Sequence, residues 1–376
     1  MKGLLKYAAL ALLPSTAFAQ FSPWPPAVTW DDKRLSFTGN IAYASNHAFQ
    51  QSEQRFRRKE LGTRLVAKDR WDLFLYYEFG ARRWFDATLT MQTRWLFDKD
   101  AGRLRIGQAR VPFGFESLTN SRNRSFLEFG LPMQAFFQNR RVGVDWAMYR
   151  PGYLVEAGYY PRSDFDTRQH SRTKAARVAW VARHDGTNVL HVGASWSSEQ
   201  MLRNLTAPLP PVRWQSRPEA NLLPVRLIDT GPLADARHVR RYGAEGLWIR
   251  GPWSLQGEYL ATHTSRRQSA AFYGHGYYAF ASYVVTGESR PYNQGQVGNI
   301  IPEHAYGALE VLLRYSYIDL NHAAVNGGRA RNLTLGLNWY LNKHWKLQAN
   351  HIFVRASRHG QVTHGRVTGL HAQLHF

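Results

Sequence analysis

The last ten residues, from Val367 to Phe376, read Val-Thr-Gly-Leu-His-Ala-Gln-Leu-His-Phe. Apolar side chains at Leu370, Leu374 and Phe376 alternate with polar ones, and this is the period of a β-strand that has one apolar face. The stretch is therefore predicted to be an amphipathic strand that stops at an aromatic residue. This expectation changes how everything upstream of it is interpreted.

A C-terminal amphipathic strand that closes on Phe resembles the ending by which Gram-negative outer-membrane β-barrel proteins are recognised for assembly. The N-terminus points to the same destination, because Lys2 and Lys6 precede an apolar run at 7–13 and Ala-Phe-Ala at 17–19 fits a small-x-small cleavage site. That apolar run is far shorter than the ~20 residues of a spanning helix. Residues 1–19 are therefore predicted to be a secretory signal.

The composition argues against a helical membrane protein and is compatible with a barrel. Mean hydropathy is -0.45, and no apolar stretch after the signal is long enough to span a membrane as a helix. A barrel needs only every second residue to be apolar, so it looks hydrophilic on average. The chain has 13 Trp and 19 Tyr, which are the residues of interfacial girdles, and its lack of Cys excludes disulfides and thiolate metal sites.

Alternation with period two recurs along the chain, for example at Leu333, Leu335 and Leu337 against Thr334 and Asn338. Short turn sequences separate the alternating runs. The fold class is predicted to be all-β, a sixteen-stranded antiparallel transmembrane β-barrel with an even strand number and both termini on one side. The expected strands are 35–46, 56–68, 71–79, 84–97, 103–112, 139–149, 152–160, 174–184, 188–198, 240–250, 252–263, 273–285, 305–317, 329–342, 345–356 and 366–376.

The expected organisation is a signal peptide (1–19), an N-terminal periplasmic segment (20–34) and one barrel domain (35–376). With both termini periplasmic, the two longest external connections are 113–138 and 199–239. Connections longer than ~15 residues are usually functional or disordered. A further long connection, 286–304, is expected on the periplasmic side. Sixteen strands leave room for an aqueous channel.

One stretch carries a family signature. Gly107-Gln108, Pro112-Phe113-Gly114 and Glu116 form a Gly-Gln-x-x-x-Pro-Phe-Gly-x-Glu pattern that resembles the strand-to-loop signature of the phosphate-selective porin O and P family. Further matches in order along the chain are Phe56-Arg57-Arg58, Phe85-Asp86-Ala87, Arg140-Arg141-Val142-Gly143-Val144, Ser216-Arg217-Pro218-Glu219, Gly243-Ala244-Glu245-Gly246-Leu247-Trp248, Val285-Thr286-Gly287-Glu288-Ser289-Arg290 and Leu335-Gly336-Leu337-Asn338-Trp339-Tyr340.

The resemblance implies a trimer of barrels, each with an inward-folded third loop and a pore lined by basic residues that passes phosphate-like anions. By position, Arg57 and Arg58 match the paired arginines of the family's constriction, Asp86 matches its aspartate, and Arg122 falls where studied members have a basic residue on the third loop. The sequence departs from the family at three places, which are Ser117 in place of lysine, Phe129 in place of arginine and Arg110 in place of tyrosine.

The charge is strongly basic. The formal net charge of +21 becomes +19 without the two lysines of the signal, and only 9 of the 48 basic residues are lysine. A lipid-facing Arg near the midplane costs about 2–4 kcal/mol, so most arginines are expected in the lumen or the loops, where rings of Arg attract anions. The candidate pore residues are Arg57, Arg58, Asp86, Arg110, Arg122, Arg124, Arg140 and Arg141, with Arg213, Arg217 and Arg226 as candidates for a vestibule. For most other arginines the alternative is contact with lipopolysaccharide phosphates or solvent.

Enzyme motifs are weak or absent. There is no Gly-x-Ser-x-Gly, His-Glu-x-x-His or Walker loop, and the glycines at 274–276 imitate a dinucleotide fingerprint inside an aromatic strand. No catalytic residue, metal site or cofactor is predicted, and the signal places the chain away from cytoplasmic nucleic acid. The prediction is a trimeric anion-selective porin of the outer membrane, in contact with its lipid, that passes inorganic phosphate or other oxyanions. The alternatives are a general or carboxylate porin and, in another class, an outer-membrane enzyme or adhesin.

Overall fold

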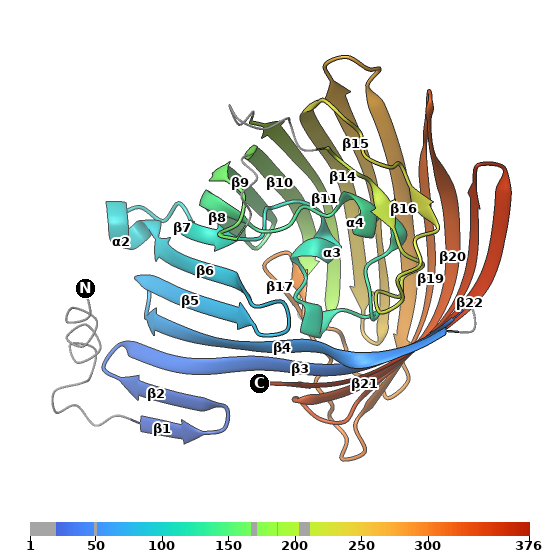
Figure 1. Ribbon diagram of the computed structural model, residues 1–376. Coiled ribbons are helices and arrows are strands. Elements are labelled where there is room, and N and C mark those ends of the chain that lie inside the picture. The colour runs from blue at the N-terminus through green and yellow to red at the C-terminus, as the bar shows by residue number, and fades with distance from the viewer. Residues whose placement is uncertain (1–19, 49–50, 167–170, 186, 203–210) are drawn as a thin grey trace.

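The computed structural model describes residues 20–48, 51–166, 171–185, 187–202 and 211–376 (Figure 1). The predicted signal peptide lies outside the described residues. No helix in the described ranges is long and apolar enough to cross a membrane.

Sixteen antiparallel strands close into a barrel. Each strand pairs with its neighbour along the chain, and the last pairs with the first, with Val367 opposite Ala48 and His375 opposite Asn40. The prediction of a sixteen-stranded antiparallel barrel is therefore confirmed. The strands are β3 (Lys33–Ala48), β4 (Gln51–Ala67), β5 (Trp71–Glu78), β6 (Arg83–Gln92), β7 (Arg103–Ala109), β8 (Arg141–Arg150), β9 (Tyr153–Arg162), β10 (Ser171–His184), β11 (Asn188–Met201), β14 (Ala236–Arg250), β15 (Trp253–Arg266), β16 (Phe272–Val284), β19 (Ala308–His322), β20 (Val325–Tyr340), β21 (Trp345–Arg358) and β22 (Gln361–His375).

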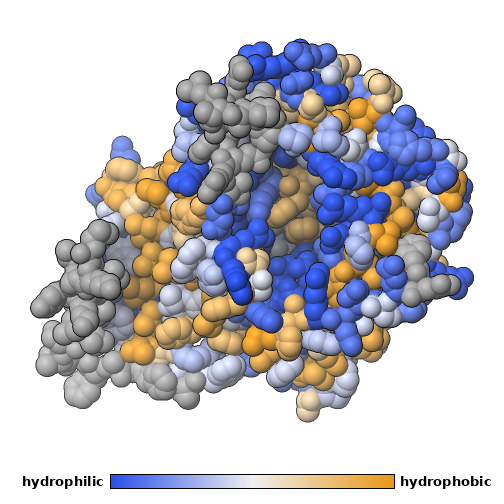
Figure 2. Space-filling model, in the orientation of Figure 1, coloured by the Kyte–Doolittle hydropathy of each residue, from blue (hydrophilic) through white to orange (hydrophobic). Residues whose placement is uncertain are grey.

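The wall has the opposite polarity to a soluble protein. Along β20 the apolar residues Leu333, Leu335 and Leu337 are exposed, whereas Thr334 and Asn338 between them are almost completely buried. Apolar side chains therefore face outward and polar ones face the interior, as a barrel in lipid requires. Figure 2 shows hydrophobic residues on the outer wall and hydrophilic ones around the opening and the rim.

Two differences from the expected strands have local causes. The fourth strand ends at Gln92 instead of continuing to 97, because α2 (Thr93–Phe97) follows it and the Thr93 hydroxyl donates to the carbonyl of Gly102 at 2.8 Å. Residues 20–30 form a hairpin of β1 (Gln20–Pro23) and β2 (Pro26–Trp30). The hairpin pairs with the N-terminal part of β3, for example through Ala27 opposite Ser36.

Three connections contact the inner face of the wall. The connection after β7 carries α3 (Phe115–Leu118), the 3-10 helix η1 (Ser121–Asn123) and α4 (Leu131–Phe136), and α4 packs against β15, β16 and β19. Figure 1 shows α3 and α4 within the ring of strands. The connection after β11 carries β12 (Gln215–Ser216) and β13 (Ile228–Asp229), and the connection after β16 carries β17 (Tyr292–Asn293) and β18 (Gln296–Val297).

The outward apolar face leads to a prediction about stability. Leu335 is 49% exposed in the middle of the apolar run of β20, so Leu335→Arg is expected to destabilise the barrel in lipid by about 2–4 kcal/mol. The measurement is the free energy of urea unfolding in phospholipid vesicles, with Leu335→Phe as the apolar control. An arginine variant as stable as the wild type would show that this face does not contact lipid.

Candidate functional site

The connection between β7 and β8, residues 110–140, is held against the inner wall by a carboxylate. Glu258 of β15 accepts hydrogen bonds from the backbone N–H groups of Phe115 at 2.5 Å and Glu116 at 2.9 Å, and from the hydroxyl of Tyr278 at 2.6 Å. The two backbone donors open α3 and have no partner within that helix, so an acceptor from the wall satisfies them. This contact places α3 inside the barrel.

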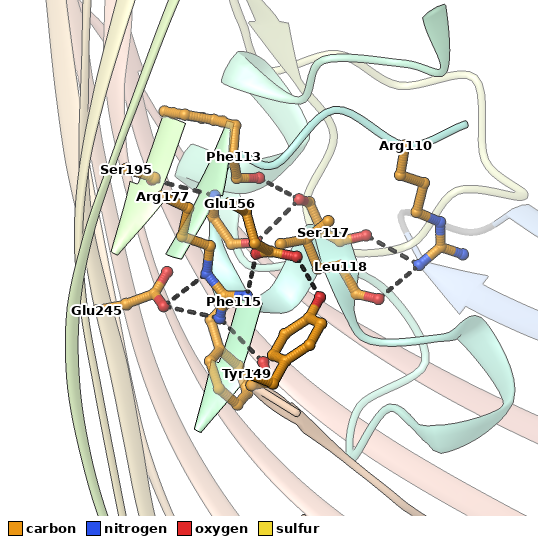
Figure 3. Close-up of polar contacts among 12 residues, drawn as sticks. Arg110, Phe113, Phe115, Ser117, Leu118, Tyr149, Glu156, Arg177, Ser195 and Glu245 are labelled. Atoms are coloured by element: carbon orange, nitrogen blue, oxygen red, sulfur yellow. Dashed lines mark hydrogen bonds and ion pairs between the residues drawn. The ribbon is translucent and has the colours of Figure 1, made fainter. Parts of the chain in front are cut away.

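Gly114 explains one element of the Pro-Phe-Gly signature. Its φ of 74° lies in the left-handed region, which favours glycine, and a Cβ at this position would lie 2.4 Å from Met133 Cε and 3.1 Å from Glu258 Oε1. The Gly114 N–H also receives support from the wall, because it donates to Ser195 Oγ at 3.1 Å (Figure 3). The signature is therefore a requirement of the turn that docks α3.

Two buried arginines of the wall complete the anchoring. Arg177 lies between Glu245, at 2.8 Å, and Glu156, at 3.0 Å, with its guanidinium 5.6 Å from the centre of the Phe115 ring (Figure 3). Arg314 donates to the Glu128 carbonyl oxygen at 3.1 Å and to the Glu219 carboxylate at 2.6 Å. Glu219 belongs to the connection after β11 and also accepts from Leu131 N–H at 3.2 Å. The two inner connections are therefore tied together.

Irregularities in the strands place consecutive residues on the inner face. On β4 the register shifts between Ala42 and Tyr43, so that Arg58 pairs with Ala42, Phe56 pairs with Tyr43, and Arg57 is an extra residue. Successive residues of a regular strand point to opposite faces, whereas a bulge changes that direction. Arg57 and Arg58 therefore both line the same cavity.

The neighbouring pair of strands repeats this device. Between β5 and β6, Tyr76 pairs with Asp86 and Tyr77 pairs with Trp84, which leaves Phe85 as the extra residue. Phe85 and Asp86 both line the interior, while Trp84 is exposed on the outer face. Asp86 accepts a two-pronged contact from Arg140 at 3.0 and 2.9 Å.

Arg110 crosses from β7 to α3. Its Nη1 donates to the carbonyl oxygens of Ser117 and Leu118, both at 3.0 Å (Figure 3), and to that of Thr119 at 2.9 Å. These carbonyls end a helix and so carry partial negative charge.

The inner connections leave two cavities against β3–β7. The first, of about 390 Å³, is lined by residues of the connection after β11 and is called the loop-side cavity; Glu128 is its one acidic lining residue. The second, of about 520 Å³, is lined by Pro25 and Phe376 and is called the terminus-side cavity. The arginines of the loop-side cavity are Arg55, Arg57, Arg58, Arg83, Arg110, Arg124, Arg140, Arg217 and Arg226.

The two cavities adjoin each other at a boundary that is called the neck. Four residues line both of them, namely Phe85, Arg110, Ser121 and Arg140. The guanidinium of Arg140 lies 4.3 Å from the centre of the Phe85 ring. A solute that passed from one cavity to the other would therefore pass two guanidinium groups and an aromatic ring.

Most arginines of the loop-side cavity have no carboxylate partner in the described ranges. Arg57 pairs with Glu128 at 2.9 Å, Arg58 pairs with Glu60 at 3.4 Å, and Arg140 pairs with Asp86. The other six form no ion pair with a described residue. Arg124 is 6% exposed, and its Nε and Nη1 have no hydrogen-bond partner in the described chain, although the group stacks on Phe129 at 4.3 Å. The cavity therefore has a surplus of positive charge.

The structure brings most of the sequence-predicted residues to these cavities. Five line the loop-side cavity as pore candidates (Arg57, Arg58, Arg110, Arg124 and Arg140), as do the vestibule candidates Arg217 and Arg226, and Asp86 and Arg122 line the terminus-side cavity. Two candidates line neither cavity. Arg141 donates to Glu199 at 2.7 Å, and Arg213 pairs with Asp229 within its own connection.

Sequence reasoning missed several arginines of the cavities. Arg55 and Arg83 line the loop-side cavity, while Arg34, Arg64, Arg103 and Arg105 line the terminus-side cavity. Arg55 could have been found from its two-residue spacing to Arg57 on one strand. Sequence reasoning also did not foresee arginines as interior anchors: Arg177, Arg290 and Arg314 are each 1% exposed and paired with carboxylates.

The closed barrel with an apolar outer face and polar interior defines the chain as a porin-type β-barrel of the Gram-negative outer membrane. The chain belongs to the family of phosphate-selective porins O and P, whose sequence model matches residues 28–376. The resemblance predicted from the sequence is thus confirmed. Family and fold are those of channel proteins.

Two curated relatives match at 28% and 27% identity. Porin O of Pseudomonas aeruginosa is 27% identical over 207 residues, which is 48% of this chain and 47% of the relative. An uncharacterized protein of Caulobacter vibrioides is 28% identical over 260 residues, which is 64% of this chain and 51% of the relative. The chain therefore spans about half the length of the curated relatives it matches.

Solved structures share the fold. OmpT of Vibrio cholerae superposes with a TM-score of 0.60 at 11% identity, over 93% of this chain and 99% of OmpT. The anion-selective porin of Comamonas acidovorans superposes with a TM-score of 0.58 at 12% identity, over 92% of this chain and 100% of that porin. At these identities the likeness concerns architecture.

The Glu258 contact can be tested directly. Glu258→Ala leaves two buried backbone donors of α3 without acceptors, at about 1–3 kcal/mol for each, so the barrel is expected to unfold at lower urea concentration and its single-channel current to become noisier. Glu258→Gln keeps one oxygen acceptor, and its stability and current noise are expected to lie between those of the wild type and the alanine variant. Identical stability and identical noise in the alanine variant would show that this carboxylate does not hold the connection.

Proposed function

We propose that the two cavities form one pore, through which phosphate-like oxyanions cross the outer membrane by passive diffusion. The observation that carries this proposal is the difference between two sets of arginines. Interior arginines of β10 and β19, such as Arg177 and Arg314, are paired with carboxylates, whereas six of the nine in the loop-side cavity form no ion pair with a described residue. Unpaired guanidinium groups repel one another, and an anion between them relieves that repulsion.

The chemistry of the lining favours oxyanions. Guanidinium groups bind phosphate and carboxylate oxygens through two parallel hydrogen bonds, so an oxyanion is held better than chloride. Passage requires several weak sites in succession, because one tight site would block the current. Arginines on both sides of the neck and at the neck itself offer such a series. The family description, phosphate-selective porin O and P, agrees with phosphate as the solute.

A second candidate is a pore for organic carboxylates. Phe85, Phe129 and Phe137 line the loop-side cavity beside the arginines, and aromatic rings suit a solute that has an apolar body. Phe129 occupies a position where studied relatives of the sequence have a basic residue, so this surface is less charged than the resemblance implied. Phosphate and citrate are therefore the two solutes to compare.

Assembly and orientation are also proposals. We infer a homotrimer with periplasmic termini, a cleaved signal at 1–19 and a periplasmic segment at 20–34. Lys59 is exposed on the outer face and lines an apolar groove of about 430 Å³ with Ile41 and Phe56. Because a lipid-facing Lys near the midplane costs about 2–4 kcal/mol, cover by another protein copy at this face fits the trimer. One OmpT structure of similar fold is described as a trimer form.

Anion preference is tested best on arginines that lack an ion pair. Arg57 and Arg58 face Glu128 and Glu60, so their removal also frees carboxylates. The sharper variant is Arg124→Gln with Arg217→Gln. Each removed charge weakens attraction for a nearby anion by about 1 kcal/mol, so the anion-to-cation permeability ratio is expected to fall several-fold in planar-bilayer reversal potentials across a potassium chloride gradient.

The matched control removes two charges from the outer face, with Arg331→Gln and Arg355→Gln, and is expected to keep the wild-type reversal potential. Chloride current in increasing phosphate, sulfate, pyrophosphate or citrate then identifies the solute, because the preferred anion blocks at the lowest concentration. A cation-selective wild-type channel would overturn the proposal. Block by citrate before phosphate would favour the carboxylate pore.

A further inference from the structure

A second basic cluster lies on the outer face, away from the pore. Arg331 of β20, Arg355 of β21 and His364 of β22 stand directly opposite one another across the three strands. All three side chains are exposed. Because the residues are direct cross-strand partners, their Cβ atoms lie about 5 Å apart from strand to strand. Together with Arg366 they are called the outer basic row.

The outer basic row lacks acidic partners in the described chain. Arg329 lies two residues before Arg331 and is paired with Asp319 at 2.7 Å, but no ion pair or hydrogen bond links Arg331, Arg355 or Arg366 to another described side chain. On the neighbouring strand, the residue opposite Arg331 is Tyr317. Like charges directly opposite each other destabilise a sheet, so the row is better satisfied with an anion bound.

The row has a fixed place relative to the apolar surface. Arg366 is the member of the outer basic row that lies nearest the middle of the barrel, where it is in register with Phe353 and Leu333 on the neighbouring strands. Its guanidinium lies 5.8 Å from the centre of the Phe353 ring. Leu335 and Leu337 continue the exposed apolar face beyond it. The cations therefore stand where a lipid-facing surface gives way to the end of the barrel opposite the termini.

We propose that the outer basic row binds the phosphorylated head group of an anionic glycolipid, lipopolysaccharide, of the outer leaflet. A phosphomonoester carries a charge of about -1.5 to -2 and three acceptor oxygens, which match two or three arginines at this spacing. The acyl chains of the same lipid would lie over Leu333, Leu335 and Leu337. This assignment rests on the proposed orientation, in which the end opposite the termini faces outward.

The chemistry distinguishes a lipid from a free anion. A free phosphate needs only the cations, whereas a lipid also uses the apolar rows beneath them, and the position of Arg366 against Phe353 joins the two surfaces. The row faces away from both cavities, so its occupant does not compete with a solute in the pore. Failure of this inference would therefore leave the proposed anion permeation untouched.

The test measures binding of diphosphoryl lipid A and of dephosphorylated lipid A to the full chain in detergent micelles, by native mass spectrometry. The wild type is expected to bind the phosphorylated lipid about tenfold more tightly or better, since each basic residue near an anionic head group contributes to attraction. Arg331→Gln with Arg355→Gln and Arg366→Gln is expected to abolish that preference while keeping the reversal potential of the wild type.

The matched control removes three exposed cations at the opposite end, with Lys68→Gln, Arg250→Gln and Lys343→Gln, and is expected to keep the preference. A variant with lysine in place of each arginine of the row retains the charge and is expected to keep most of the preference for the phosphorylated lipid. This variant keeps the proposal testable if the glutamine variant fails to fold. Equal binding of both lipids by the wild type overturns the proposal. Displacement of the lipid by an equal concentration of inorganic phosphate also overturns it, because the site would then take a free anion.

Discussion

The constraint on which the structure depends is that a wall in lipid must satisfy every backbone hydrogen bond within the protein. Pairing of β22 with β3 closes the sheet, and Gly39 and Phe376 extend this pairing through reciprocal hydrogen bonds of 3.0 and 3.1 Å. Closure divides the side chains by strand period, apolar to the outside and polar to the inside. A chain with a large excess of arginine is thereby forced to place its cations in the interior, in the connections or near the ends of the barrel.

The interior solves that problem in two ways. On the wall formed by β9–β20, arginines are paired with carboxylates and hold the connections inside the barrel, as Arg177 does with Glu156 and Glu245, and as Arg314 does with Glu219. Breaking such a buried pair by removing one partner is strongly destabilising. On the other side of the interior, the arginines of the loop-side cavity line open space, and six of those nine form no ion pair with a described residue. The asymmetry of pairing, more than the number of arginines, separates structural cations from those available to a solute.

The backbone contributes to this asymmetry at two points. The register shifts at Arg57 and Phe85 lie on β4 and β6, and each adds one residue to the inner face. In a regular strand Arg57 and Arg58 would have pointed to opposite sides, one of them into lipid. The bulges therefore let the short motifs Arg57-Arg58 and Phe85-Asp86 contribute both of their residues to the interior.

The architecture could be predicted from the sequence alone, because alternation with period two is a local property and a closed sheet is the one way for such strands to cross a membrane. Strand number, the closing strand at Phe376 and the region of the docked connection were all readable from the sequence, and Arg110 and Arg140 could be named as candidate pore residues. The tertiary structure was needed to show which arginines are paired, because a partner such as Glu245 for Arg177 lies 68 residues away. It also decided the bulges, the inward course of the connection after β16, and the separation of an inner set of cations from the outer basic row.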